Sequence, residues 1–276
     1  MTFEFPFTDS DFSRVRALIH RHAGIALGVQ KREMVYSRVS RRVRELRLPT
    51  FTSYLDLLEA GRDGDEWQVF INALTTNLTS FFRESHHFPV LAGLARKCRG
   101  PLTVWCAAAS TGEEPYSIAI TLAEALGDQA ASARVIATDI DTEVLAKAAA
   151  GVFVADRVGH MSTDRLKRFF SKGTGANQGY VRVRPELAAM VKFARLNLLD
   201  AAWPVREPVD AIFCRNVMIY FDKATQRRVL ERFVPLLKPH GLLFAGHSEN
   251  ASLVTPAFRS IGQTVYELAQ ARGAEQ

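Results

Sequence analysis

The spacing of apolar residues divides the chain into two unlike halves. Over the first 75 positions apolar residues recur every three or four places, and no stretch alternates as a β-strand does. This pattern predicts helices, the first capped by Ser10 or Ser13 and running through Arg21, and the second ending at Leu48-Pro49. This second helix spans 29–47, and two further helices are predicted over 54–60, after Thr52-Ser53, and over 65–74.

From about Gly100 onward, short apolar runs alternate with stretches of helical periodicity. Strands separated by helices are typical of a parallel sheet covered on both faces, so we expect an α/β domain with a doubly wound sheet. A final pair of runs predicts a hairpin or sheet edge at 258–261 and 263–267. The predicted strands are 102–107, 134–138, 191–197, 210–215 and 242–246, and the predicted helices are 114–126, 142–150, 163–170 and 223–237.

A small antiparallel β insertion interrupts this order. The stretch 173–179 is rich in glycine, and 180–184 alternates between apolar and basic residues, so we expect a β subdomain at about 171–190. The predicted organisation is a helical domain over 1–75, a linker over 76–99, and an α/β domain over 100–276.

The composition is that of an ordinary globular protein. Hydrophobic residues make up 47% of the 276 positions and charged residues 23%, and no apolar run reaches the length of a membrane span. The first twelve residues carry three acids and no base, unlike a secretory signal. Cys98, Cys106 and Cys214 are far apart and form no C-x-x-C pair. We therefore expect a reduced, cytoplasmic protein without membrane insertion, structural metal or disulfide.

The formal net charge of +6 is concentrated in the second predicted helix. Val35, Val39, Val43 and Leu46 form its apolar stripe. The helix is either a solvated amphipathic face or a docking surface for an acidic helix or a phosphate backbone. Tyr36 is its one aromatic residue, so the pattern weakly favours an acidic protein over single-stranded nucleic acid. The basic residues of this segment are Lys31, Arg32, Arg38, Arg41, Arg42, Arg44 and Arg47, opposed by Glu33 and Glu45.

Two loops of the α/β half carry the pattern of a nucleoside site. The loop 106–115 (CAAASTGEEP) follows the first predicted strand, and its small residues allow close approach of a ligand. It is not a G-x-G-x-x-G segment and has no P-loop lysine, which argues against NAD and ATP. Asp139 and Asp141 follow the second strand, where we expect Asp139 to bind a ribose diol and Asp141 to cap the next helix. An adenosine ligand without phosphates, S-adenosylmethionine, fits best.

Three other motifs carry low functional weight. The segment 246–250 (GHSEN) resembles a nucleophile elbow but ends in Asn instead of Gly. Gly173 and Gly175 follow no strand that leads into a helix, so they indicate a turn. His86 and His87 are adjacent, and on a helix they would point apart and not bind one metal.

Five segments together resemble the CheR family, the chemotaxis receptor glutamate methyltransferases. The resemblance covers nearly the whole chain and includes the helical domain and the β insertion. The segments are 75–84 (TTNLTSFFRE), 107–117 (AAASTGEEPYS), 137–141 (ATDID), 212–222 (IFCRNVMIYFD) and 241–250 (GLLFAGHSEN).

The resemblance implies a class I S-adenosylmethionine-dependent methyltransferase sheet, with S-adenosylhomocysteine as the product and the linker contributing to the active site. It places an arginine and a tyrosine at the reaction centre, which match Arg83 and Tyr220. Glu113, next to the matching Glu114, is expected to cap a helix or face solvent. The implied cofactor-binding residues are Asn77, Thr79, Arg83, Glu114, Asp139, Asn197, Leu198, Asn216 and Val217.

The family's substrate is a glutamate on a long receptor helix, so the resemblance implies that the basic helix faces chemoreceptor cytoplasmic domains. Some family members also capture a receptor's C-terminal pentapeptide by adding a strand to the β insertion. The expected receptor contacts are Arg38, Arg41 and Arg42 on the basic helix, and Lys172, Arg182 and Arg184 on the insertion.

Two rival functions remain. One is a nucleic-acid methyltransferase with a basic N-terminal domain, but the segment 215–220 (RNVMIY) lacks the Asn/Asp-Pro-Pro-aromatic motif typical of base methylation at an exocyclic nitrogen. The other is a non-catalytic cofactor sensor, which the presence of both Arg83 and Tyr220 disfavours.

Overall fold

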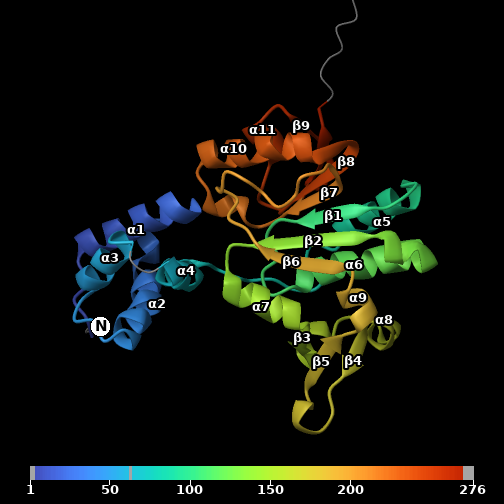
Figure 1. Cartoon of the computed structure of the whole chain (residues 1–276). Helices are drawn as coiled ribbons and strands as arrows, with labels where there is room; N and C mark the ends of the chain where they lie inside the picture. The colour runs from blue at the N-terminus through green and yellow to red at the C-terminus, as the bar shows by residue number, and fades with distance from the viewer. Residues whose placement is uncertain (1–3, 62–63, 270–276) are drawn as a thin grey trace, which may run out of the picture.

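The computed structural model describes residues 4–61 and 64–269 (Figure 1). Its first part is the predicted all-helical domain, in which the fourth helix leads toward the α/β domain. Val35, Val39 and Val43 are at most 1% exposed, so the apolar stripe of the basic helix packs into this domain's core as predicted. The helices are α1 (Asp9–Ala23), a 3-10 turn η1 (Val29–Lys31), α2 (Arg32–Glu45), α3 (Phe51–Glu59) and α4 (Gly64–Leu74).

Two helices of this domain begin earlier than predicted. Thr8, not Ser10 or Ser13, caps α1: its hydroxyl accepts the Asp11 amide, and the Asp11 carboxylate accepts the Thr8 amide, which forms a capping box. Thr50 caps α3 in place of Thr52-Ser53. Several hydroxyl residues stand near each helix start, so the sequence pattern alone did not select the cap.

The second part is a seven-stranded sheet in the order β6-β2-β1-β7-β8-β10-β9. All pairs are parallel except those of β10, which runs antiparallel to both neighbours. The predicted doubly wound sheet is thereby confirmed. The strands are β1 (Thr103–Cys106), β2 (Arg134–Asp139), β6 (Val191–Arg195), β7 (Val209–Cys214), β8 (Leu237–Ala245), β9 (Phe258–Gly262) and β10 (Val265–Leu268).

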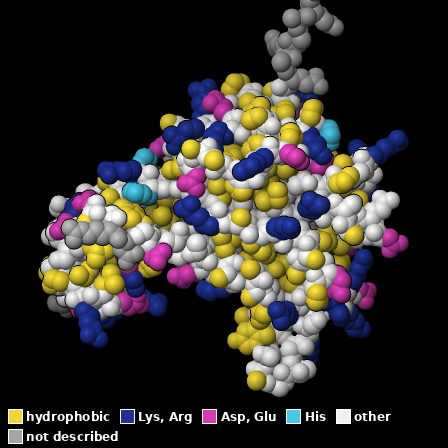
Figure 2. Space-filling model, in the orientation of Figure 1, with side chains coloured by type: hydrophobic (Ala, Val, Ile, Leu, Met, Phe, Trp, Pro, Cys, Tyr) yellow, Lys and Arg dark blue, Asp and Glu magenta, His cyan; other side chains and the backbone are white. Residues whose placement is uncertain are grey.

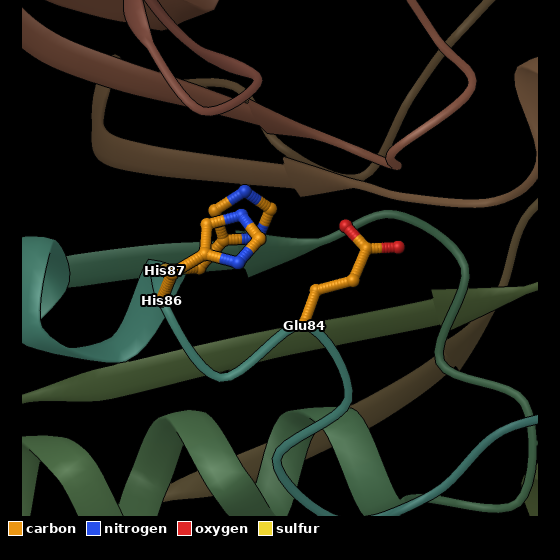
Figure 3. Close-up of side chains that lie close together, drawn as sticks. All are labelled: Glu84, His86 and His87. Carbon is orange, nitrogen blue, oxygen red and sulfur yellow. The ribbon is translucent and has the colours of Figure 1, made fainter.

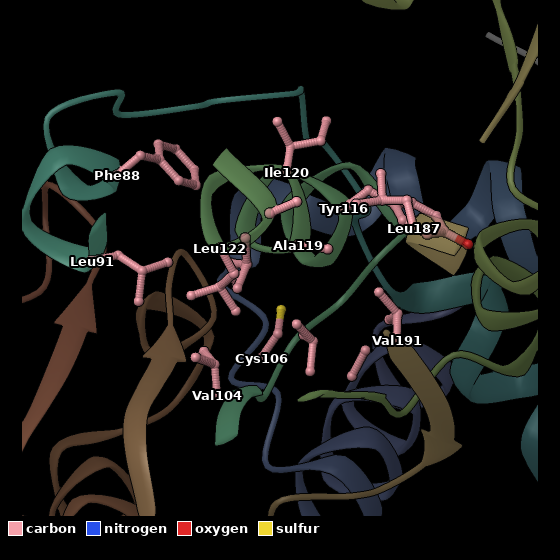
Figure 4. Close-up of a cluster of buried hydrophobic side chains, with 14 of the residues drawn as sticks. Phe88, Leu91, Val104, Cys106, Tyr116, Ala119, Ile120, Leu122, Leu187 and Val191 are labelled. Atoms are coloured by element: carbon pink, nitrogen blue, oxygen red, sulfur yellow. The ribbon is translucent and has the colours of Figure 1, made fainter. Parts of the chain in front are cut away.

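The strands are apolar on both faces because helices cover both. Along β1, Val104 and Cys106 join one core cluster, whereas Trp105 joins the other. Helices α5 and α6 contribute to the first cluster (Figure 4), and α10 contributes to the second. The covering helices are α5 (His87–Lys97), α6 (Glu113–Leu126), α7 (Thr142–Ala150), α10 (Lys223–Phe233) and α11 (Ala251–Val254).

Several predicted boundaries are wrong. The helix predicted over 223–237 ends at Phe233, four residues early. The linker 76–99, whose bounds stay a prediction, contains helix α5. Strand β8 begins at Leu237, five residues before the predicted start, although it contains Pro239 and Gly241. The register between β7 and β8 shifts at this place: Val209 pairs with Leu237, but Ala211 pairs with Leu242.

The β insertion is a three-stranded antiparallel sheet in the order β3-β5-β4. It takes in the three-residue strand β3, so the sheet begins well before the predicted boundary near residue 171. In Figure 1 it projects from the sheet domain, away from β8 and α10. Its elements are β3 (Val152–Val154), η3 (Ala155–Val158), α8 (Thr163–Phe169), β4 (Phe170–Lys172), η4 (Gly175–Asn177), β5 (Tyr180–Val183) and α9 (Pro185–Ala188).

The remaining short helical turns lie in loops of the sheet domain. They are η2 (Gly127–Ser132), η5 (Met218–Tyr220) and η6 (Val234–Leu236). No helix within 4–61 and 64–269 combines the length and apolar character needed to span a bilayer.

Candidate active site

A cavity of about 490 Å³ opens at the carboxyl ends of the central strands and faces the helical domain. Ala107, Asp139 and Asn216, which lie at or just beyond the ends of β1, β2 and β7, line it. Ligands of doubly wound sheets bind at this edge. The cavity brings together all the residues assigned to the cofactor or the reaction centre, namely Asn77, Thr79, Arg83, Glu114, Asp139, Asn197, Leu198, Asn216, Val217 and Tyr220.

Asp139 lies at the end of β2 and is 8% exposed. Its carboxylate accepts the backbone N–H groups of Ser110 at 2.7 Å and Asp141 at 3.0 Å. Burial raises the pKa of Asp139 to about 6, and these hydrogen bonds oppose the shift. Ionised Asp139 retains acceptor capacity for hydroxyl groups, which suits a ribose diol.

Asp141 caps α7, as predicted, by accepting the backbone N–H groups of Glu143 and Val144. Its second oxygen has a further role that the sequence did not reveal. It accepts hydrogen bonds from the Thr75 hydroxyl at 2.6 Å and the Asn77 side-chain amide at 2.8 Å. The cap therefore also fastens the start of the linker to the cavity rim.

Glu114 forms a buried ion pair with Arg215, whose guanidinium donates to it at 2.6 Å. The Cys106 thiol also donates to Glu114 at 3.4 Å. Burial raises the pKa of Glu114, and the positive charge of Arg215 opposes that shift. A carboxylate at this place can accept hydrogen bonds from the α-ammonium group of an amino-acid cofactor.

Arg215 is the main site residue that the sequence interpretation missed. Its side chain is fully buried, donates to the Arg83 carbonyl oxygen, and lies 3.4 Å from a carboxylate oxygen of Glu84. Glu84 in turn accepts a hydrogen bond from the side-chain amide of Asn216 at 3.2 Å. Arg215 directly precedes Asn216 in the segment 212–222, and this position was the one indication in the sequence that it belongs to the site.

Arg83 and Tyr220 are half-buried at the cavity. The Arg83 guanidinium donates to the Leu78 carbonyl oxygen at 2.8 Å, which leaves most of its five N–H donors for a ligand. Tyr220 ends the turn η5, and its carbonyl oxygen accepts the Ala26 amide at 2.8 Å. This bond ties the reaction-centre turn to the helical domain.

A second tie between the domains uses Asn197. Its side-chain amide donates to the His22 carbonyl oxygen at 2.6 Å, and its side-chain oxygen accepts the Leu199 amide. Asn197 is 6% exposed. It therefore shapes the cavity by holding the helical domain over the end of β6.

Glu113 does not face solvent, so that prediction is wrong. Its side chain is 1% exposed because it pairs with Arg157 from the β insertion. Its second oxygen accepts the Thr111 hydroxyl at 2.5 Å. The partner lies 44 residues away in the chain, which hid the pair from sequence patterns.

The three arginines predicted on the basic helix differ in their contacts. Arg41 is exposed and pairs only with Glu45 of the same helix among the described contacts. The Arg38 guanidinium donates to the Thr75 carbonyl oxygen, and Arg42 pairs with the buried Glu66. Only Arg41 therefore presents its charge mainly to solvent.

The basic residues predicted on the insertion are all exposed. Lys172 and Arg184 line the same shallow depression beside β4 and β5, and Arg182 lies on β5. Val152, Val154 and Tyr180 add exposed apolar surface nearby, and Figure 2 shows hydrophobic side chains on this projection.

His86 and His87 lie together, so the prediction that they point apart is wrong. Their ring centroids are 4.2 Å apart, and both Nε2 atoms face the Gln263 carbonyl oxygen at 3.2 and 3.0 Å (Figure 3). His86 is the N-cap residue of α5, and both rings turn toward the same carbonyl oxygen of Gln263. Burial lowers the pKa of His87 to about 4, so its neutral ring can donate to this carbonyl. Glu84 lies beside the rings, but the charge of Arg215 next to it opposes binding of a dication.

The doubly wound sheet and the cavity at its carboxyl edge, lined by the buried carboxylates of Asp139 and Glu114, fit an S-adenosylmethionine-dependent methyltransferase. Residues 77–267 match the family model described as CheR methyltransferase, SAM binding domain, and residues 10–75 match CheR methyltransferase, all-alpha domain. The chain belongs to the CheR family.

Relatives support this assignment over almost the full length. The chain is 58% identical over 97% of its length to a chemotaxis protein methyltransferase of Klebsiella aerogenes, covering 92% of that protein. It is 56% identical over 98% of its length to the chemotaxis protein methyltransferase of Escherichia coli, covering 94%. A chemotaxis protein methyltransferase 2 of Pseudomonas aeruginosa is 55% identical over 95% of this chain and 94% of its own.

Cofactor affinity should depend on pH through Asp139, whose pKa is about 6. If Asp139 binds the ribose as predicted, the ribose hydroxyl groups donate to its ionised carboxylate, and protonation below this pKa competes with binding. We expect the Kd for S-adenosylhomocysteine to be constant from pH 7 to 8 and to rise about tenfold per unit below pH 6, measured by calorimetry. Asp139→Asn should bind weakly with a flat profile. A wild-type Kd that is equal at pH 5 and pH 7 contradicts this role.

Proposed function

We propose that the enzyme transfers the methyl group of S-adenosylmethionine to glutamate side chains of chemoreceptors. The products are glutamate methyl esters and S-adenosylhomocysteine, and the enzyme acts in the cytoplasm. The names of the chemotaxis relatives support the receptor as substrate. The observation that carries the ester chemistry is the placement of Arg83 and Tyr220 together at the cofactor cavity.

The reaction requires little acid–base machinery. A glutamate carboxylate has a pKa of roughly 4.3, so it is a ready nucleophile near neutral pH. When bound, S-adenosylmethionine supplies a methyl group activated on a sulfonium, and it leaves as a neutral thioether. Neither a general base nor a general acid is needed. The task of the protein is to hold one carboxylate oxygen in line with the methyl group.

Arg83 and Tyr220 suit this task in different ways. The planar guanidinium of Arg83 can bind a carboxylate through two parallel hydrogen bonds. Its grip should be moderate, because the carboxylate loses its charge as the ester forms and a strong ion pair would favour the ground state. The Tyr220 hydroxyl can donate one hydrogen bond to orient the substrate, and its ring shields the site from water.

The proposed partner surfaces are the basic helix and the insertion. Acidic receptor helices fit the charge of α2, where Arg41 is the most accessible of the predicted contacts. Arg38 and Arg42 also hold the domain itself together, so their part in docking is secondary. Lys172, Arg182 and Arg184 are proposed contacts for a receptor C-terminal pentapeptide that adds a strand at an edge of the β3-β5-β4 sheet.

A nucleic-acid substrate is the alternative that fits less well. The segment 215–220 carries Arg215 and Asn216 in structural roles and offers no Pro-Pro-aromatic wall for a base. Nucleic acid binding would also depend steeply on salt, which a competition assay with duplex and single strands measures.

Substitution of the reaction-centre residues tests the ester chemistry. With saturating radiolabelled cofactor and a receptor cytoplasmic domain, we expect Arg83→Ala to lower kcat about 100-fold because positioning is lost. Tyr220→Phe should lower kcat about tenfold, the equivalent of one hydrogen bond. Arg96→Ala, an exposed arginine on α5, serves as the control and should be unaffected. The incorporated label must leave as methanol in mild base, and label that stays attached refutes a glutamate ester.

Charge reversal on the basic helix tests receptor docking. Arg41→Glu should raise KM for the receptor several-fold and leave the Kd for S-adenosylhomocysteine unchanged, since Arg41 lies outside the cavity. The matched control is Arg96→Glu on α5. An equal loss of cofactor affinity in Arg41→Glu, or an unchanged receptor KM, rejects the docking assignment.

A calorimetric titration tests the pentapeptide site. An acidic C-terminal pentapeptide with an aromatic residue should bind the wild type, and Arg182→Glu should weaken this binding because an exposed positive charge on β5 becomes negative. Absence of heat at high peptide concentration rejects tethering through the insertion.

A further inference from the structure

Arg157 of η3 bridges three segments that are far apart in the chain. One of its terminal nitrogens donates to the Thr79 carbonyl oxygen at 2.8 Å, and its Nε donates to Glu113 at 3.0 Å. Thr79 belongs to the linker, and Glu113 begins α6 beside Glu114. Arg157 does not itself line the cavity, but Thr79 and Glu114 do.

The linker is docked on the insertion by packing as well as by this hydrogen bond. Phe81 is 2% exposed, and its ring packs edge-on against Phe153 of β3 and Phe170 of β4, with centroids 4.9 and 5.7 Å away. Thr79 and Phe81 thus both rest on the insertion, and Arg83 follows two residues later. The segment that carries the reaction-centre guanidinium is therefore seated on the β insertion.

The other contacts of this segment leave Thr79 dependent on Arg157. The Asn77 carbonyl oxygen accepts the Ser110 hydroxyl at 3.2 Å, and the Phe82 amide donates to the Ser117 hydroxyl at 2.9 Å. These anchors belong to the sheet domain and lie on either side of Thr79. Arg157 holds the carbonyl oxygen between them, and the buried charge of Glu113 fixes its guanidinium.

We infer that Arg157 is a positioning residue for methyl transfer, through which the β insertion holds the active-site segment 77–84 in place. The inference rests on the proposed function for its kinetic consequence, but its structural consequence stands apart from it. It makes the insertion a support for the reaction centre in addition to any peptide site on its edge. Arg157 bridges a carboxylate oxygen and a carbonyl oxygen with two nitrogens of one planar group, an arrangement that lysine reproduces only in part.

The test compares Arg157→Met, Arg157→Lys and the double variant Arg157→Met/Glu113→Gln, which avoids a buried carboxylate without a partner. Arg259→Met is the matched control, since Arg259 also forms an ion pair on a sheet edge, with Glu267, and contacts no residue of 77–84 among the described hydrogen bonds and ion pairs. For the double variant we expect kcat at saturating cofactor to fall about 10- to 100-fold while receptor KM stays within about twofold. Relative to Arg157→Met, the Arg157→Lys variant should regain the wild-type melting temperature but only part of the wild-type kcat.

Hydrogen exchange separates this inference from the proposed function. Amides of 77–84 should exchange faster in the Arg157 variants than in wild type and in Arg259→Met, whether or not a receptor is methylated. Exchange equal to wild type overturns the inference. Faster exchange with wild-type kcat, or a lower melting temperature with wild-type kcat, also overturns it, since Arg157 would then only stabilise the fold. Failure of the wild type to methylate any receptor rejects the proposed function alone.

Discussion

The fully buried guanidinium of Arg215 is the constraint on which the active site depends. A charge without access to water must be paired, and removing one partner of such a pair typically costs about 3–5 kcal/mol. Its partners come from two separate segments, Glu84 of the linker and Glu114 of α6, and it also holds the Arg83 carbonyl oxygen. The linker must therefore fold over the ends of the strands before this charge is satisfied. Formation of the core and assembly of the reaction centre are thereby coupled.

The helical domain completes the cavity instead of lying beside it as a separate module. The His22 carbonyl oxygen accepts a hydrogen bond from the Asn197 side chain, and the Ala26 backbone N–H donates to the Tyr220 carbonyl oxygen. Both domains therefore hold residues of the cavity rim in place. His20 and Asp222 add a hydrogen bond at the surface of the same junction. Under the proposed function, a receptor helix docked on α2 would rest on the same domain whose Ala26 backbone holds Tyr220.

The sequence predicted the parallel sheet, the helical domain and the cap by Asp141, because local apolar periodicity or a short motif indicates each of them. It did not predict α5 or β3, since α5 lies in a motif-rich linker and β3 has only three residues that are stabilised by pairing with β5. The ion pairs of Glu113 and Arg42 were not predicted for a different reason. Their partners, Arg157 and Glu66, lie 44 and 24 residues away, and only the tertiary fold turns these exposed-looking charges into ion pairs.

The turn after β8 contains a position with no room for any atom larger than hydrogen. The backbone N–H groups of Gly246 and Asn216 both donate hydrogen bonds to the Glu249 carboxylate. A Cβ at position 246 would lie 2.8 Å from the Asn216 backbone nitrogen and 2.4 Å from its side-chain nitrogen. Every other amino acid there would displace Asn216, which lines the cavity. Although the segment resembles the nucleophile elbow of a hydrolase, its constrained position is Gly246 and not the serine. Ser248 is exposed, so a substitution there does not meet the crowding that surrounds Gly246.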